Sequence, residues 1–203
     1  VMGQSPQLFL QADAGGGAGW WYYLHQQDDL IGERMDRTHF DASISAAFRV
    51  RLQGDQLSVA LAYQRKSLLD DELVAYDDRV GSRHRIPVAK QGGAVNRHCV
   101  GVNVGYTFVQ KPAYRVSTEF ELGTFSINSL HPDQKNFGLR MYRQFFLTQH
   151  FRLADRLFLL VSMQYSRSHI WTIESAFPGE KHDFVSGGLN VGFEWLITAP
   201  RSE

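Results

Sequence analysis

The chain of 203 residues is predicted to be all-β and to fold as an eight-stranded antiparallel up-and-down transmembrane β-barrel. Three observations lead to this fold class. Apolar and polar residues alternate with a period of two through eight long runs, whereas helical spacing is nearly absent. Short and long connections alternate between these runs, and the polar face of the runs carries mainly small residues.

Each of the eight runs is long enough to cross a bilayer as a tilted strand, which takes about 9–11 residues. The chain has no window of about 18 uninterrupted apolar residues, and this excludes a transmembrane helix. The runs comprise residues 7–24, 38–53, 56–68, 95–110, 113–127, 136–152, 156–173 and 183–198.

The connections between the runs indicate how the strands are arranged. Three of them, at residues 54–55, 111–112 and 153–155, are short turn signals. The other four are longer and polar, and the longest is 69–94. Such alternation is expected when an even number of antiparallel strands has tight periplasmic turns and longer outer loops. We therefore expect one barrel domain over residues 1–203, with short periplasmic ends.

The composition excludes several function classes. The 21 basic and 21 acidic residues cancel, which gives no reason to expect a nucleic-acid partner. The single cysteine, Cys99, cannot form an internal disulfide. Neither a phosphate-binding Gly-rich loop nor zinc-ligand spacing occurs, so no cofactor and no metal are predicted. The first residues lack the basic and apolar regions of a signal peptide, and we interpret them as a mature or nearly mature start.

The two faces of the runs differ in residue type. In the run 95–110, Val100 and Val102 alternate with Gly101 and Asn103. All lysines lie at run ends or in connections, as expected if a mid-bilayer lysine costs about 2–4 kcal/mol. We predict that the apolar face contacts lipid and that the small polar face lines the lumen, the interior of the barrel. A soluble calycin-like ligand-binding barrel, which also has one apolar and one polar face, stays open as an alternative.

Ten charged residues fall on the lumen face, five of each sign. Buried charges are tolerated when they are paired and hydrogen-bonded, so we predict an ion-pair network there. Because eight strands leave an interior just wide enough for side chains, the network is expected to plug the barrel. The predicted members are Asp13, Asp41, Glu119, Glu121, Glu194, Arg49, Arg51, Lys66, Arg115 and Arg140.

Arg143 is an exception, because the alternation in the run 136–152 places it on the lipid face. A charge in that position is costly in lipid. Either the strand shifts register there, or Arg143 meets a partner.

Aromatic residues gather near the run ends, as in the girdles that mark the two membrane interfaces. The segment "GGGAGWWYY" at residues 15–23 contains one such point. Gly15, Gly17 and Gly19 are predicted to face the lumen, and the aromatic residues that follow mark the outer interface. The outer girdle is predicted to include Trp20, Tyr22, Tyr63 and Trp171.

The longest connection, 69–94, carries an acidic and a basic cluster. The carboxylates are suited to a hard cation, and the arginines are suited to lipopolysaccharide phosphates. The interpretation that the sequence favours is a solvated loop whose two halves neutralise each other, and cation or lipopolysaccharide contacts are the alternatives. The candidate contacts are Asp70, Asp71, Glu72, Asp77, Asp78, Arg79, Arg83 and Arg85.

The long runs, the alternating connections and the closing "NVGFEWLI", Asn190 to Ile197, resemble the small eight-stranded outer-membrane proteins of Gram-negative bacteria. These include the OmpX and OmpA-type membrane domains and porin-like barrels. The resemblance implies a bacterial outer-membrane location, contact with outer-membrane lipid and lipopolysaccharide, and biogenesis by the barrel-assembly machinery. In this class a last-strand aromatic residue is read by that machinery, and Phe193 and Trp195 look like that signal.

The resemblance implies a structural or accessory subunit that presents extracellular loops, in one version inside a larger outer-membrane complex. A minority of the class modify lipid A, but Ser168-His169 followed by Glu174 has the wrong order for such a deacylase. An acyltransferase site would need histidine, aspartate and serine near the outer rim. Residues of these types are found there at His25, Asp36, His39 and Ser43. We expect a non-enzymatic protein, with lipid A modification as the alternative.

Overall fold

The computed structural model describes residues 6–26, 33–68, 72–77, 82–87, 95–128, 137–172 and 181–198. Side chains are described for 6–20, 42–67, 97–126, 141–169 and 184–198. In the described part, no helix is long and apolar enough to cross a membrane.

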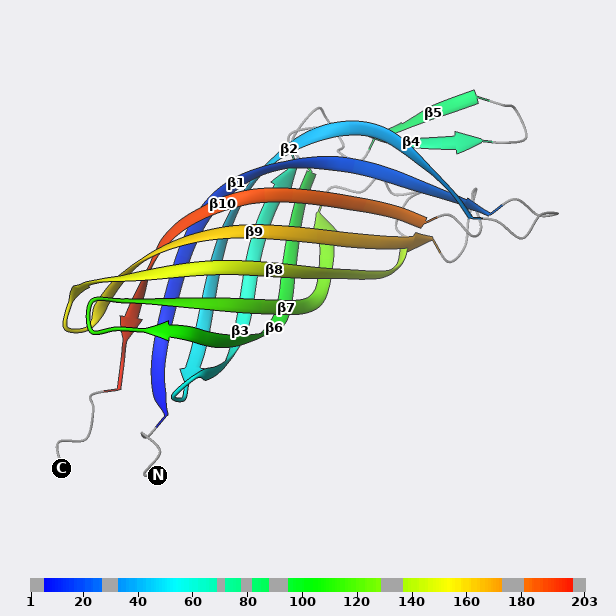
Figure 1. Ribbon diagram of the computed structural model, residues 1–203. Helices are drawn as coiled ribbons and strands as arrows, with labels where there is room; N and C mark the ends of the chain where they lie inside the picture. The colour runs from blue at the N-terminus through cyan, green and yellow to red at the C-terminus, as the bar shows by residue number, and fades with distance from the viewer. Residues whose placement is uncertain are drawn as a thin grey trace.

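Eight antiparallel strands close into a barrel in the order β1-β10-β9-β8-β7-β6-β3-β2 (Figure 1). The prediction of an eight-stranded up-and-down barrel is confirmed, because barrel strands that follow one another along the chain also pair in space. The strands are β1 (Gln7–Gln26), β2 (Glu33–Gln53), β3 (Leu57–Leu68), β6 (Val95–Gln110), β7 (Tyr114–Asn128), β8 (Phe137–Ala154), β9 (Leu157–Thr172) and β10 (Lys181–Leu196).

The connection 69–94 differs from the expected plain loop. It contains two short strands, β4 (Glu72–Asp77) and β5 (Ser82–Pro87), which pair antiparallel in a separate sheet. This hairpin lies beyond the end of the barrel that carries the longer connections (Figure 1). Six-residue strands contain too few alternations to stand out from a polar loop.

The short turns and the seam lie at the opposite end of the barrel. The turn after β2 is closed by the Gly54 amide, which donates to the Leu57 carbonyl at 2.8 Å. The start of β1 and the end of β10 meet at this end, where the Ile197 amide donates to the Leu8 carbonyl at 2.8 Å. The predicted placement of the tight turns at one end is therefore confirmed.

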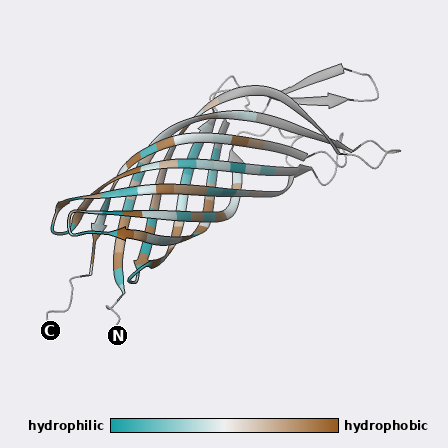
Figure 2. Ribbon diagram, viewed as in Figure 1, coloured by the Kyte–Doolittle hydropathy of each residue, from teal (hydrophilic) through white to brown (hydrophobic). Residues whose placement is uncertain are grey.

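The barrel is apolar outside and polar inside. Leu61 is 68% exposed and Met163 is 61% exposed, whereas Asn103 and Glu121 are fully buried. Figure 2 shows apolar and polar residues alternating along the described strands. This arrangement confirms the predicted faces. It also removes the soluble calycin-like alternative, because a soluble barrel keeps its apolar face away from water.

Candidate functional site in the barrel lumen

Arg51 on β2 stands at the centre of a charged layer near the short-turn end. Its side chain is 1% exposed. The guanidinium donates to Glu119 Oε1 on β7 at 2.8 Å and to Glu194 Oε1 on β10 at 3.1 Å. It also donates to Gln11 Oε1 on β1 at 2.8 Å. One arginine therefore joins four strands around the barrel.

Arg49, two residues earlier on the same face of β2, makes a second layer. Its Nε donates to Glu121 Oε2 on β7 at 2.9 Å, and its Nη1 donates to Asp13 on β1. The guanidinium also lies over the Phe146 ring, 4.9 Å from the centroid. The Tyr142 hydroxyl donates to the other oxygen of Glu121 at 2.9 Å. This carboxylate thus receives hydrogen bonds from both sides of the lumen.

Two close-packed glycines make room for Tyr142 on β8. A Cβ added at Gly101 would overlap the tyrosine hydroxyl, and one at Gly123 would lie 2.7 Å from its ring. Gly123 pairs with Tyr142 on the neighbouring strand, and Gly101 pairs with Gly123 on the next one, so the tyrosine ring lies over both. Small residues on the lumen face therefore leave space for the large side chains that cross it.

Below Arg51, Glu194 joins a third set of groups. Arg115 on β7 donates to Glu194 Oε2, and His150 Nδ1 on β8 lies 3.2 Å from the same oxygen. The hydroxyl of Ser117 lies 3.1 Å from His150 Nε2. The Arg115 guanidinium packs against the Phe9 ring, 5.0 Å from the centroid.

Toward the longer connections the lumen holds cations packed on aromatic rings. Lys66 Nζ donates to Ser186 Oγ at 3.0 Å and lies 5.1 Å from the Phe184 ring centroid. Arg97 lies between Phe125 and Phe184, at 5.0 Å and 5.5 Å from their centroids. These rings belong to the inner face, so the aromatic residues of this chain are not confined to the membrane interfaces.

The structure places eight of the ten predicted lumen residues inside the barrel: Asp13, Arg49, Arg51, Lys66, Arg115, Glu119, Glu121 and Glu194. The side chains of Asp41 and Arg140 lie outside the described residues. Sequence reasoning missed the neutral members of the network, Gln11, Ser117, Tyr142 and His150. These neutral residues alternate in phase with the charged residues of their strands, and this pattern could have placed them on the lumen face.

Ser117, His150 and Glu194 have the connectivity of a hydrolase triad. A hydroxyl, an imidazole and a carboxylate are linked in that order by contacts of 3.1 and 3.2 Å. Three facts weaken a catalytic interpretation. Ser117 is 4% exposed, it also donates to Glu119 at 3.3 Å, and Arg115 lies 3.1 Å from the same nitrogen of His150 that faces Glu194.

The structure describes only some of the enzymatic candidates considered from sequence. Ser168 is buried on the lumen side of β9, whereas its neighbour His169 follows the outward parity of Met163 and Tyr165. Ser43 is buried in the lumen, where its hydroxyl lies 3.5 Å from the Gly17 carbonyl oxygen. The remaining candidates fall outside the described side chains: His25, Asp36, His39 and Glu174.

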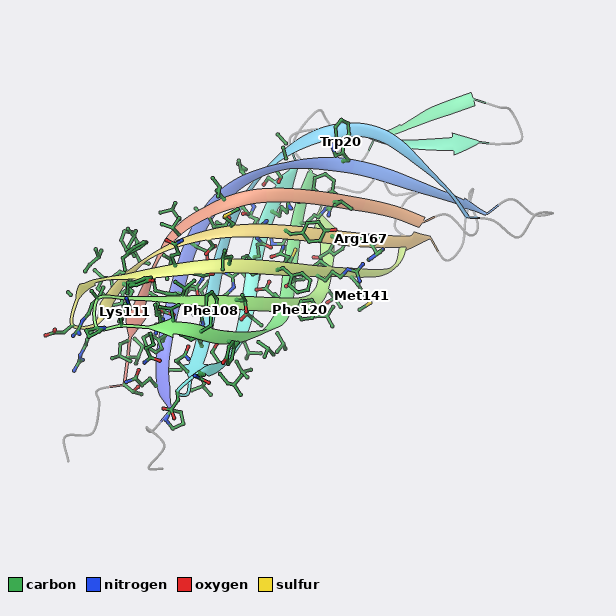
Figure 3. The ribbon with its side chains drawn as sticks, in the orientation of Figure 1. Trp20, Phe108, Lys111, Phe120, Met141 and Arg167 are labelled. Carbon is green, nitrogen blue, oxygen red and sulfur yellow. The ribbon has the colours of Figure 1, made fainter. Side chains whose placement is uncertain are left out.

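The predicted outer girdle is only partly described. Tyr63 is 45% exposed on the outer wall, and its hydroxyl lies 2.7 Å from His98 Nδ1. Trp20 is half-buried on β1, toward the end with the longer connections (Figure 3). The side chains of Tyr22 and Trp171 lie outside the described residues.

The loop candidates are placed only as backbone. Glu72, Asp77, Arg83 and Arg85 belong to the β4–β5 hairpin, where Arg83 stands opposite Tyr76 in the register. Asp70, Asp71, Asp78 and Arg79 lie outside the described residues. The part of the chain that the structure describes contains no group of three or more residues suited to a metal ion. Cation and lipopolysaccharide contacts in this loop stay predictions.

Eight antiparallel strands, an apolar outer wall and a charged interior define a small transmembrane β-barrel of the outer-membrane type. The fold is similar to that of Neisserial surface protein A, with a TM-score of 0.50 and 10% identity over 91% of this chain and 96% of that one. It is also similar to the outer membrane protein OprG from Pseudomonas aeruginosa, with a TM-score of 0.53 and 10% identity over 97% and 98%. No family model and no curated protein matches the chain.

Proposed function

We propose that this chain is an integral protein of a bacterial outer membrane, plugged by its own side chains, that serves as a structural or accessory subunit and presents loops outside. The observation that carries the proposal is the pair of layers around Arg49 and Arg51. Each arginine is 1% exposed and bridges β2 to strands across the lumen. Guanidinium groups bonded across the lumen in this way support a plugged interior.

The fixed position of these charges also supports a structural role. Buried charges must be paired to offset the cost of removing them from water, and most of the polar atoms in these layers are paired, although Arg49 Nη2 and Arg51 Nε have no hydrogen-bond partner among the described residues. Glu194 meets Arg51, Arg115 and His150, and Glu119 meets Arg51 and Asn103. A permeation path would require these contacts to break.

Planar-bilayer recording tests the plug. The refolded protein, checked for heat-modifiable gel mobility, is expected to insert without producing stable conductance steps. Reproducible steps from the wild-type protein, free of a contaminating porin, would contradict a plugged lumen. A protein that stayed soluble without detergent and showed no heat-modifiable mobility would contradict the membrane assignment itself.

We also propose partners for this barrel. Outer-membrane lipid and lipopolysaccharide would surround the apolar wall, and the barrel-assembly machinery would insert the chain. Phe193 and Trp195 on β10 are 44% and 50% exposed, which supports their role as an outward-facing assembly signal. Membership of a larger complex is tested by identifying what copurifies in mild detergent.

A lipid A-modifying hydrolase is the second candidate, because Ser117, His150 and Glu194 have the order of nucleophile, base and acid. The burial of Ser117 favours the structural role. We expect no labelling by a fluorophosphonate probe, and an unchanged lipid A acyl pattern in cells that express the protein. Labelling that disappears in Ser117→Ala, together with a changed acyl pattern, would favour the hydrolase over the structural role.

A further inference from the structure

Two arginines on the membrane-facing wall lie directly opposite each other. Arg143 on β8 is exposed, and its neighbours on that face include Phe145, which is 53% exposed. Arg167 on β9 follows Tyr165 on the same face, and Tyr165 is 47% exposed. The β8–β9 register pairs Arg143 with Arg167 (Figure 3 labels the latter). The β8 register is continuous from Met141 to Phe151, so no register shift turns Arg143 inward.

Direct pairing of two arginines is unusual. Residues opposite each other in adjacent antiparallel strands have Cβ atoms about 4.5–5.5 Å apart, and like charges in such positions repel. His169 stands opposite Met141, one step along the same outer face. Asp183 of β10 is opposite His169 in the register. The two arginines and His169 therefore stand close together on the outer face of β8 and β9.

The height of the pair on the barrel indicates which part of the membrane it meets. Arg167 is ten residues from Leu157, where β9 leaves the short-turn end. At about 3.3 Å per residue and a tilt near 40°, this distance is on the order of 25 Å. The apolar band of an outer-membrane barrel is about 25 Å tall. The pair therefore lies at the interface nearest the longer connections, where phosphate groups of lipids are found.

We propose that Arg143 and Arg167 bind a phosphate of a phosphorylated glycolipid in the outer leaflet. This inference rests on the proposed outer-membrane location. Two guanidinium groups can each donate a pair of hydrogen bonds to phosphate oxygens. A phosphate between them would accept hydrogen bonds from both side chains, while Phe145 and Tyr165 lie below on the same face to contact acyl chains. Neither residue is among the loop arginines named from the sequence, Arg79, Arg83 and Arg85.

The test is native mass spectrometry of the detergent-solubilised, folded protein titrated with bis-phosphorylated lipid A. We expect bound lipid A in the wild type and at least tenfold weaker binding in R143Q/R167Q. The matched control is K111Q/R156Q, which removes the same charge from exposed positions at the short-turn rim and should bind like the wild type. R143K/R167K keeps the charge without the planar fork and should bind with intermediate strength.

Competing ligands identify the source of the phosphate. Dephosphorylated lipid A, phosphatidylglycerol and inorganic phosphate should each fail to match bis-phosphorylated lipid A. Equal binding by any of them, or wild-type affinity in R143Q/R167Q, would overturn the inference. Heat-modifiable mobility is measured for every variant. If the wild-type protein lacks heat-modifiable mobility, the proposed outer-membrane function fails as well. If the wild-type protein shows it but does not bind lipid A, only the site at Arg143 and Arg167 is contradicted.

Discussion

Arg51 shows how much a single lumen residue holds together. It is almost fully buried, and its guanidinium contacts Glu119, Glu194 and Gln11 on three different strands. Removing one partner from a buried ion pair leaves an uncompensated charge, which is more harmful than replacing the whole pair. Without the Arg51 guanidinium, the carboxylates of Glu119 and Glu194 would keep only some of their hydrogen-bond donors.

We expect Arg51→Ala to lower the free energy of unfolding by about 3–5 kcal/mol. The measurement is urea unfolding of the protein in lipid vesicles, followed by tryptophan fluorescence. The matched control is Arg152→Ala, whose ion pair with Asp155 is largely exposed and should contribute about 0–1 kcal/mol. Equal losses in the two variants would show that the lumen network does not stabilise the barrel.

At the scale of the elements, β6 and β7 approach closely because both carry glycine where Tyr142 crosses. A Cβ at Gly123 would meet the tyrosine ring, the Gly101 Cα and the Val100 carbonyl. By contrast, the nearest atom to a Cβ at Gly187 is the Gln164 carbonyl oxygen at 3.9 Å. Gly123 and Gly187 are therefore a matched pair, because a glycine at each position has very different space for an added methyl group.

We expect Gly123→Ala to destabilise the barrel by about 1–3 kcal/mol, the usual effect of overpacking. Gly187→Ala should change stability by less, since its new methyl group meets only ordinary van der Waals contacts. The same vesicle unfolding assay compares them. A larger loss at position 187 would contradict the close packing of β6, β7 and Tyr142.

Sequence reasoning predicted the elements better than their contacts. Period-two alternation located all eight barrel strands, although β2 begins at Glu33 and not at residue 38. The alternation also separated inward from outward residues, because parity alone decides the face. It could not choose partners inside the lumen, since the stagger between strands decides that Arg51 meets Glu119 and Glu194. The β4–β5 hairpin was too short to leave a clear periodic signal.

At the scale of the whole molecule, the barrel reverses the usual distribution of polar and apolar residues. Its apolar wall and buried charges are compatible with each other only in a membrane, where lipid covers the first and ion pairing satisfies the second. If the lumen is plugged as proposed, the layers around Arg49 and Arg51 block ions, with Phe146 packed against the Arg49 guanidinium.

Truncating the side chains of these two layers should open the barrel. We expect R49A/R51A/F146A, if it retains heat-modifiable mobility, to produce small conductance steps in planar bilayers that the wild type lacks. The variant K111Q/R156Q, altered only at the short-turn rim, should stay silent. A folded but silent triple variant would mean that other lumen side chains suffice to block ions.

The seam between β1 and β10 has a consequence for how the protein is made. The Leu8 amide donates to the Thr198 hydroxyl, a contact between residues 190 positions apart. Contacts of such long range carry a large loop-closure entropy and form slowly. Until β10 has been delivered, β1 has an unpaired edge that can join any other extended chain. Synthesis of nearly the whole polypeptide must therefore precede closure, and a chain truncated before β10 would be prone to aggregate through that edge.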